Sequence, residues 1–183
     1  MKKDKLDISE EVYSNFKKLA GYQIIGGLIG IGLIIWLTFK TEVLDLASVV
    51  VLSLMMLLFL YSFFCGVRLI QAKENALKFS LINQCIQVFG FSILGFGFTY
   101  VSGLYLTVEF DFTEIINFNF GLGVSKFGLT FNSDSDTLAF NVNIIALLLI
   151  YWITKLMKKV KTEIDIGKSD TIGTDLIPQS IEN

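Results

Sequence analysis

Four long stretches without Asp, Glu, Lys or Arg constrain the fold of this chain more than any other feature. They cover residues 19–39, 46–67, 79–108 and 137–154, and they are between 18 and 30 residues long. The hydrocarbon core of a bilayer is about 30 Å thick, so a helix of about 20 residues crosses it. Backbone groups in lipid must be paired within their own segment, which favours helices. The sequence therefore predicts an all-α membrane protein with four transmembrane helices.

Two other interpretations compete with this one. A soluble all-α core is disfavoured because 53% of the residues are hydrophobic and soluble helices seldom stay uncharged for so long. A cleaved signal sequence has an apolar region of about 7–15 residues and a small-residue cleavage site. The first stretch is longer, and no such site follows before Asp45. We expect spans at about 20–39, 46–67, 84–106 and 138–155, within a transmembrane domain of residues 19–157.

The basic residues indicate the orientation of these spans. Thirteen of the fifteen Lys and Arg residues fall before the first span, between the second and third, or after the fourth. Only Lys40 and Lys126 fall on the other side. Basic residues in short loops stay on the cytoplasmic side, so both termini are predicted to be cytoplasmic. Short outer loops and the absence of a sorting signal favour the cytoplasmic (inner) membrane of a bacterium.

The two ends of the chain are predicted to lie outside the bilayer. Ile8, Val12 and Phe16 recur at helical spacing within residues 1–18. This segment is either a cytoplasmic amphipathic helix on the inner leaflet or a lead-in that extends the first span. At the other end, residues 158–183 lose apolar density and are predicted to be a flexible cytoplasmic tail.

Small residues within the spans suggest how the helices pack. Gly26 and Gly30 form a GxxxG pair in the first span, and Gly95, Thr99 and Gly103 repeat every four residues in the third. Small residues let membrane helices approach closely. These five residues are the candidate helix-packing residues, between spans one and three or in a homo-oligomer. The polar residues at the start of the third stretch are interpreted as interfacial: Asn83, Gln84 and Gln87.

The predicted outer loop, residues 107–137, has a period-two pattern that is typical of strands. Apolar residues alternate with polar or small ones from Val108 to Phe112 and again from Phe118 to Phe131. The second segment predicts a short extracytoplasmic β-hairpin. Its apolar face is expected to rest on the outer end of the bundle, on the membrane surface or on a partner. The candidate outer interaction surface consists of six aromatic residues: Phe110, Phe112, Phe118, Phe120, Phe127 and Phe131.

The sequence lacks residues and patterns that commonly carry catalysis or bind a metal ion. The chain has no His, which removes the commonest general base and metal ligand. The series Asn132, Asp134 and Asp136 begins like a calcium loop, but Thr137 and Asn143 replace the required Gly and Glu. We therefore predict no enzyme activity and no catalytic, cofactor-binding or metal-binding residue. Cys65 and Cys85 are predicted to be free thiols near the cytoplasmic ends of their spans, with a redox pair as the alternative.

No motif in the sequence assigns a specific function to this chain. The expected role is that of a non-enzymatic accessory, scaffold or immunity-type interaction protein. The alternative is a small oligomeric carrier or channel for a neutral or apolar solute, lined by Ser92, Thr99 and Ser102. The expected partners are the lipid bilayer and either a second copy of the chain or another membrane protein, with no nucleic acid.

Overall fold

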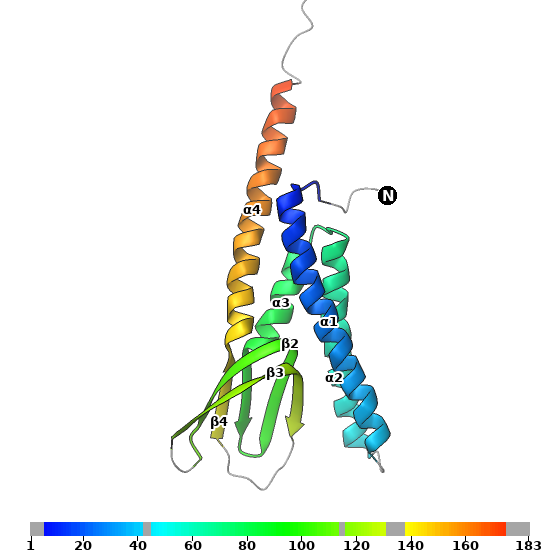
Figure 1. Cartoon of the computed structure of the whole chain (residues 1–183), viewed down its shortest axis with the longest axis vertical. Helices are drawn as coiled ribbons and strands as arrows, with labels where there is room; N and C mark the ends of the chain where they lie inside the picture. Colours follow the sequence, from blue (N-terminus) through cyan, green and yellow to red (C-terminus); the bar gives the residue numbers. More distant parts are fainter. Residues whose placement is uncertain (1–5, 42–44, 114–115, 131–137, 175–183) are drawn as a thin grey trace, which may run out of the picture.

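The computed structural model describes residues 6–41, 45–113, 116–130 and 138–174. These residues form helices and one antiparallel sheet (Figure 1). The prediction of an all-α protein with four transmembrane helices is therefore wrong. The elements in chain order are α1 (Glu10–Lys40), α2 (Leu46–Ile70), α3 (Ala76–Val88), β1 (Phe89–Ile93), β2 (Phe96–Asp111), β3 (Asn117–Thr130), β4 (Leu138–Asn143) and α4 (Ile144–Thr174).

Two of the four predicted spans are not membrane-spanning helices. Among the described residues, α1 and α2 are the helices long and apolar enough to cross a membrane. The third uncharged stretch changes from helix to strand between Val88 and Phe89, and the fourth begins as strand β4 and becomes helical at Ile144. The multi-pass arrangement based on four spans is corrected accordingly.

Helices α1 and α2 form an antiparallel hairpin (Figure 1). Side-chain caps fix where both helices begin, since they satisfy N–H groups that have no partner in the first turn. The Ser9 hydroxyl accepts a hydrogen bond from the Val12 N–H at 3.4 Å, and the Asp45 carboxylate accepts one from Ser48 at 2.9 Å. Helix α1 is continuous through residues 10–40, so the amphipathic segment at its start is part of the same helix.

Strand β1 follows α3 directly and turns back into β2. Leu94 and Gly95 both have positive φ, of 48° and 83°, as the two central residues of a type I′ hairpin turn require. The sheet order is β1-β4-β2-β3. In addition, β1 pairs with the start of β2, so that β1, β2 and β4 each pair with the other two. The long strand β2 bends to make this possible, with a register shift between Val101 and Leu104.

The segment predicted to be a hairpin, Phe118 to Phe131, is instead one strand as far as it is described. Strand β3 pairs with β2 from Asn117 to Thr130. Ser125 lies at the bulge with φ of 48°, opposite Gly103 with φ of 103°. A β-bulge of this kind sharpens the twist of the strand without ending the pairing. Phe131 lies outside the described residues.

Helix α4 begins at the end of β4. The Asn143 side chain accepts hydrogen bonds from the N–H groups of Ile145 at 3.1 Å and Ala146 at 3.4 Å, which caps the helix. The helix continues to Thr174, so most of the segment expected to be a flexible tail is helical. In Figure 1 its second half extends beyond the hairpin, at the end of the molecule where α1 begins.

Two apolar cores stabilise the fold. The first lies at the end where α1 and α3 begin, and Val12, Phe16 and Leu19 of α1 are fully buried in it against α2, α3 and α4. The apolar stripe at the start of α1 is thus covered by protein. The second core joins the hairpin to the sheet through Ile34, Met55, Phe59 and Tyr100. The rings of Phe59 and Tyr100 meet edge to face with centroids 5.2 Å apart.

Candidate functional site

A cluster of buried, uncharged polar side chains lies between the two apolar cores. Along α1 it falls between Leu19 and Ile34, and along α2 between Phe59 and Leu69. Each member is at most 1% exposed, and four elements contribute to it. We call it the polar cluster, and its members are Gln23 (α1), Ser62 (α2), Ser80, Asn83, Gln84 and Gln87 (α3), and Ser102 (β2).

Ser62 is the centre of the hydrogen bonding in this cluster. Its hydroxyl donates to the backbone carbonyl of Gln23 at 3.3 Å. It accepts from the Ser102 hydroxyl at 2.8 Å and from the side-chain amide of Asn83 at 3.1 Å. The Gln87 side chain accepts a hydrogen bond from the Ser102 backbone N–H at 2.8 Å. The cluster therefore connects three helices to the sheet at the point where β2 bends.

Several amide atoms of the cluster have no partner among the described residues. They are the side-chain nitrogens of Gln23 and Gln87 and both polar side-chain atoms of Gln84. Burying an amide without a hydrogen bond costs roughly 1–3 kcal/mol. The polar residues in the second half of α3 are buried inside the protein, so the interpretation of Asn83, Gln84 and Gln87 as interfacial is wrong.

Hydroxyl and carboxamide groups define what this cluster can do chemically. They donate and accept hydrogen bonds, and they do not ionise near neutral pH. Charged side chains and His do not occur among its members. The cluster is suited to positioning helices on the sheet and to holding a neutral hydrogen-bonding group.

Next to the cluster, α1 approaches the bulge of the sheet closely. The Ser125 hydroxyl accepts a hydrogen bond from the Gly103 N–H at 3.1 Å and donates one to the Gly26 carbonyl at 3.1 Å. The Tyr22 hydroxyl donates to the Leu104 carbonyl at 2.8 Å. A β-carbon on Gly26 would overlap the backbone of Gly103. These contacts fix α1 against the bend of β2.

The five candidate helix-packing residues lie in helix α1, in the turn between β1 and β2, and in strand β2. Gly26 lies against Gly103, and Gly30 lies against the Phe59 ring of α2. Gly95 is in the turn between β1 and β2, while Thr99 and Gly103 are in β2. The expected helical face of Gly95, Thr99 and Gly103 therefore does not exist, because these residues are not helical.

The hairpin α1–α2 has a large exposed apolar surface. Only 28% of the most apolar part of each helix is buried. A core helix of a soluble protein would be mostly buried, and exposed apolar patches of this size on monomers are rare. The most exposed members of this hairpin surface are Ile25, Leu28, Trp36 and Phe39 of α1 and Leu46, Val50 and Leu57 of α2.

The sheet also exposes an apolar face, formed by cross-strand neighbours on β2, β3 and β4. Phe120 and Leu122 are each 76% exposed, and their partners on β2 are Val108 and Leu106. The Phe110 and Phe118 rings meet edge to face at 5.4 Å. We call this surface the sheet apolar face, and its residues are Leu104, Leu106, Val108 and Phe110 of β2, Phe118, Phe120, Leu122 and Val124 of β3, and Phe140 and Val142 of β4.

The candidate outer interaction residues divide into two groups. Phe110, Phe118 and Phe120 belong to the sheet apolar face, and Phe112 is 42% exposed just beyond β2. In contrast, Phe127 packs edge-on against Phe59 of the hairpin, with centroids 6.3 Å apart.

One long edge of the sheet is open in the part of the chain that the structure describes. Strand β3 pairs with β2 along one side and has no second neighbour there. Its residues 117–125 carry no charge and no Pro, which are two of the usual devices that protect an edge strand. In Figure 1 the β2–β3 ribbon extends away from the hairpin at the lower left.

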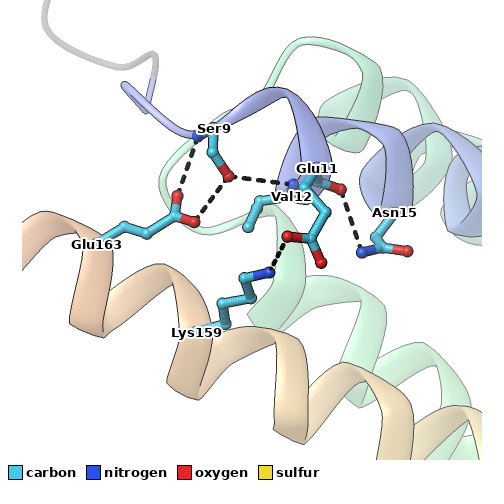
Figure 2. Close-up of polar contacts among 6 residues, drawn as sticks. All are labelled: Ser9, Glu11, Val12, Asn15, Lys159 and Glu163. Atoms are coloured by element: carbon cyan, nitrogen blue, oxygen red, sulfur yellow. Dashed lines mark hydrogen bonds and ion pairs between the residues drawn. The ribbon is translucent and has the colours of Figure 1, made fainter.

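The start of α1 is attached to the middle of α4 by polar contacts at the surface (Figure 2). The Glu163 carboxylate accepts hydrogen bonds from the Ser9 N–H at 3.0 Å and the Ser9 hydroxyl at 2.7 Å. Both bonds lower the pKa of Glu163, and Lys159 lowers it further. Lys159 also pairs with Glu11 at 2.6 Å.

Sequence patterns did not reveal the polar cluster, because isolated Gln, Asn and Ser residues also occur at membrane interfaces.

Cys65 is buried and Cys85 is exposed, and both are free. Within the described ranges, no group of three or more His, Cys, Asp or Glu side chains could hold a metal ion.

Comparison with models of protein families, with curated proteins and with solved structures finds no match to this chain.

Proposed function

We propose that this protein is a non-enzymatic subunit of a membrane assembly. The hairpin α1–α2 inserts into the bilayer, and the sheet is covered by a partner protein. The uncharged part of α1, residues 19–39, is about 31 Å long at about 1.5 Å per residue, which matches the hydrocarbon thickness. The observation that carries the proposal is the exposed, uncharged surface of both helices.

The need for a partner follows from the position of the sheet beside the hairpin (Figure 1). Contacts such as Gly26 to Gly103 and Phe59 to Tyr100 place β2 at the depth of the apolar part of both helices. Unpaired backbone groups in hydrocarbon cost several kcal/mol each, so an open sheet edge does not face lipid. At this depth the edge of β3 requires another chain, and a strand of that chain would pair with it.

The distribution of basic residues supports an orientation with the start of α1 in the cytoplasm. Lys17, Lys18, Arg68 and Lys73 flank the hairpin at the end where α1 begins, and Lys40 is at the opposite end. Short basic flanks remain cytoplasmic. The second half of α4 extends from the same end of the molecule (Figure 1).

Insertion is tested with charge substitutions on the hairpin surface. Leu28→Arg and Leu57→Arg place a charge at the middle of the hairpin, where it costs about 2.5–3.5 kcal/mol in a bilayer. We expect both variants to lose resistance to alkaline extraction from membranes. Ile166→Arg, at an equally exposed apolar position of α4, is the matched control and should remain in the membrane fraction. Retention of all three variants at the wild-type level would contradict insertion.

Coverage of the sheet is tested by photocrosslinking in intact membranes. A photoreactive side chain at Phe120 is expected to form an adduct with a protein, either a second copy or another subunit. The same group at Leu28 is expected to react with lipid. If Phe120 gave only lipid adducts, the sheet would face the bilayer and the proposed assembly would be wrong.

A second candidate function, transport of a small neutral solute, is favoured by one observation. The side-chain nitrogens of Gln23 and Gln87 and the whole side-chain amide of Gln84, which have no partner among the described residues, are buried at the depth of the hairpin. Solute-driven swelling of proteoliposomes tests this. If the protein transports a solute, proteoliposomes that contain it should swell, and Gln84→Leu should reduce this swelling. Swelling no greater than that of protein-free liposomes would exclude transport.

A further inference from the structure

An open groove lies between the start of α3 and the middle of α4, with a volume of about 570 Å³. One face of each helix lines it at helical spacing: residues 77, 78 and 81 of α3, and 154, 157, 158, 160, 161, 164 and 165 of α4. Glu74 lines it from the turn just before α3. Leu6 contributes from the segment before α1, and its N–H donates to the Ala72 carbonyl at 2.9 Å.

The floor of the groove is apolar. Leu77, Leu81, Met157, Val160 and Ile164 line it, and all belong to or pack against the first core. A groove of this size and lining accommodates a hydrocarbon chain.

The rim of the groove is basic, and its charge changes along the length of the groove. Lys78, Lys158 and Lys161 are exposed on it, and no ion pair joins them to another described residue. Because α3 and α4 are antiparallel, Glu74, just before α3, and Asp165 of α4 both line the end of the groove that is farther from the sheet. The three ammonium groups thus lie between these acidic residues and the uncharged parts of both helices.

We propose that this groove binds an anionic phospholipid, with its phosphate at Lys78, Lys158 and Lys161 and an acyl chain along Leu81 and Met157. The inference rests on the proposed insertion of α1–α2, which places these lysines at the headgroup level. Basic grooves between helices at the cytoplasmic boundary of a membrane select anionic headgroups. Lys side chains act as flexible point charges and reach a phosphate without a fixed geometry.

The test uses the full chain, delipidated in a neutral detergent. Phosphatidylglycerol and phosphatidylcholine with identical acyl chains are titrated separately, and bound lipid is counted by native mass spectrometry. We expect phosphatidylglycerol to bind at least about 10-fold more tightly. The triple variant Lys78→Gln, Lys158→Gln and Lys161→Gln should lose this preference, whereas Lys17→Gln, Lys18→Gln and Lys155→Gln, with the same net charge, should keep it.

A second variant tests the acyl chain separately from the charge. Met157→Trp narrows the groove and keeps all three lysines, so it should weaken binding of phosphatidylglycerol about as strongly as the triple variant. Equal binding of both lipids to the wild type, or equal losses in the two triple variants, would overturn the inference. If the protein were extracted by alkali but still selected phosphatidylglycerol, the proposed insertion would fail and the groove would stand. If it resisted extraction but selected neither lipid, the groove alone would fail.

Discussion

Gly26 of α1 lies directly against Gly103 of β2, and the two backbones are close enough that a β-carbon on Gly26 would overlap the Gly103 peptide. The Ser125 hydroxyl bridges the pair, with hydrogen bonds of 3.1 Å to each. Gly103 needs its φ of 103° for the bulge, which only Gly adopts without strain. The contact between hairpin and sheet therefore depends on small residues on both sides.

Gly26→Ala should destabilise the protein. The new methyl group would meet backbone atoms, which cannot rotate away, and overpacking of this kind costs about 1–3 kcal/mol. Gly32→Ala is the matched control on the same helix, because nothing lies within 4 Å of its added carbon and Ala favours helix by up to about 1 kcal/mol. Thermal unfolding in detergent should show a lower Tm for the first variant alone. Equal Tm values for both variants would mean that α1 does not dock on the bulge.

Two neighbouring glutamines of α3 should respond in opposite ways to replacement by Leu. Gln87→Leu leaves the Ser102 N–H without its acceptor and should cost about 1–3 kcal/mol. Gln84→Leu removes an amide without a partner in the described structure, so stability should be unchanged or rise by up to about 1 kcal/mol. Chemical or thermal unfolding of both variants gives the comparison. A loss for Gln84→Leu as large as for Gln87→Leu would show that Gln84 binds a group inside the protein.

The sequence predicted the hairpin helices better than the rest of the fold. The first two uncharged stretches lie within α1 and α2, because a long apolar run with helical caps at Ser9 and Asp45 has one favourable conformation. The third stretch is equally uncharged, but hydropathy does not distinguish a membrane helix from a strand with apolar residues on its faces. The alternation in Phe89, Phe91, Phe96 and Phe98 indicates strands, and the turn between them uses Leu94 at positive φ, for which Leu has no preference.

The polar cluster was not predictable for a different reason. A Gln at a membrane interface and a Gln in a buried network have the same sequence context, and only tertiary contacts separate them. Asn83 and Gln87 meet Ser62 and Ser102, which are distant in the sequence. In the same way, the period-two pattern from Phe118 indicated a strand, but its pairing with β2 rather than with itself is a long-range property.

The bond between Ser9 and Glu163 should make stability depend on pH. The carboxylate form accepts two hydrogen bonds in the folded protein, which holds the pKa of Glu163 below its ordinary value of 4.5. Its stabilisation is therefore complete above that ordinary value and is lost as the pH falls through the lowered folded value. Because Glu163 is largely solvated, the effect should be below about 1 kcal/mol.

The measurement is Tm between pH 7 and pH 3 for the wild type and Glu163→Gln. We expect a lower Tm for the variant at pH 7 and convergence of the two curves at the acidic end. Asp165→Asn, which removes an exposed carboxylate from the same helix, is the control and should match the wild type at pH 7. A constant difference between wild type and Glu163→Gln across this range would rule out the pH-dependent bond.

Cysteine labelling tests the insertion of α1–α2 most directly. In a variant with Cys65→Ala and Cys85→Ala, a single Leu28→Cys is compared with a single Ile166→Cys, since both side chains are more than half exposed on the protein itself. Intact membrane vesicles with the cytoplasmic face outward are treated with a charged maleimide before and after detergent is added. We expect Ile166→Cys to be labelled in both conditions and Leu28→Cys only in detergent. Labelling of Leu28→Cys in intact membranes, at the rate of Ile166→Cys, would contradict insertion.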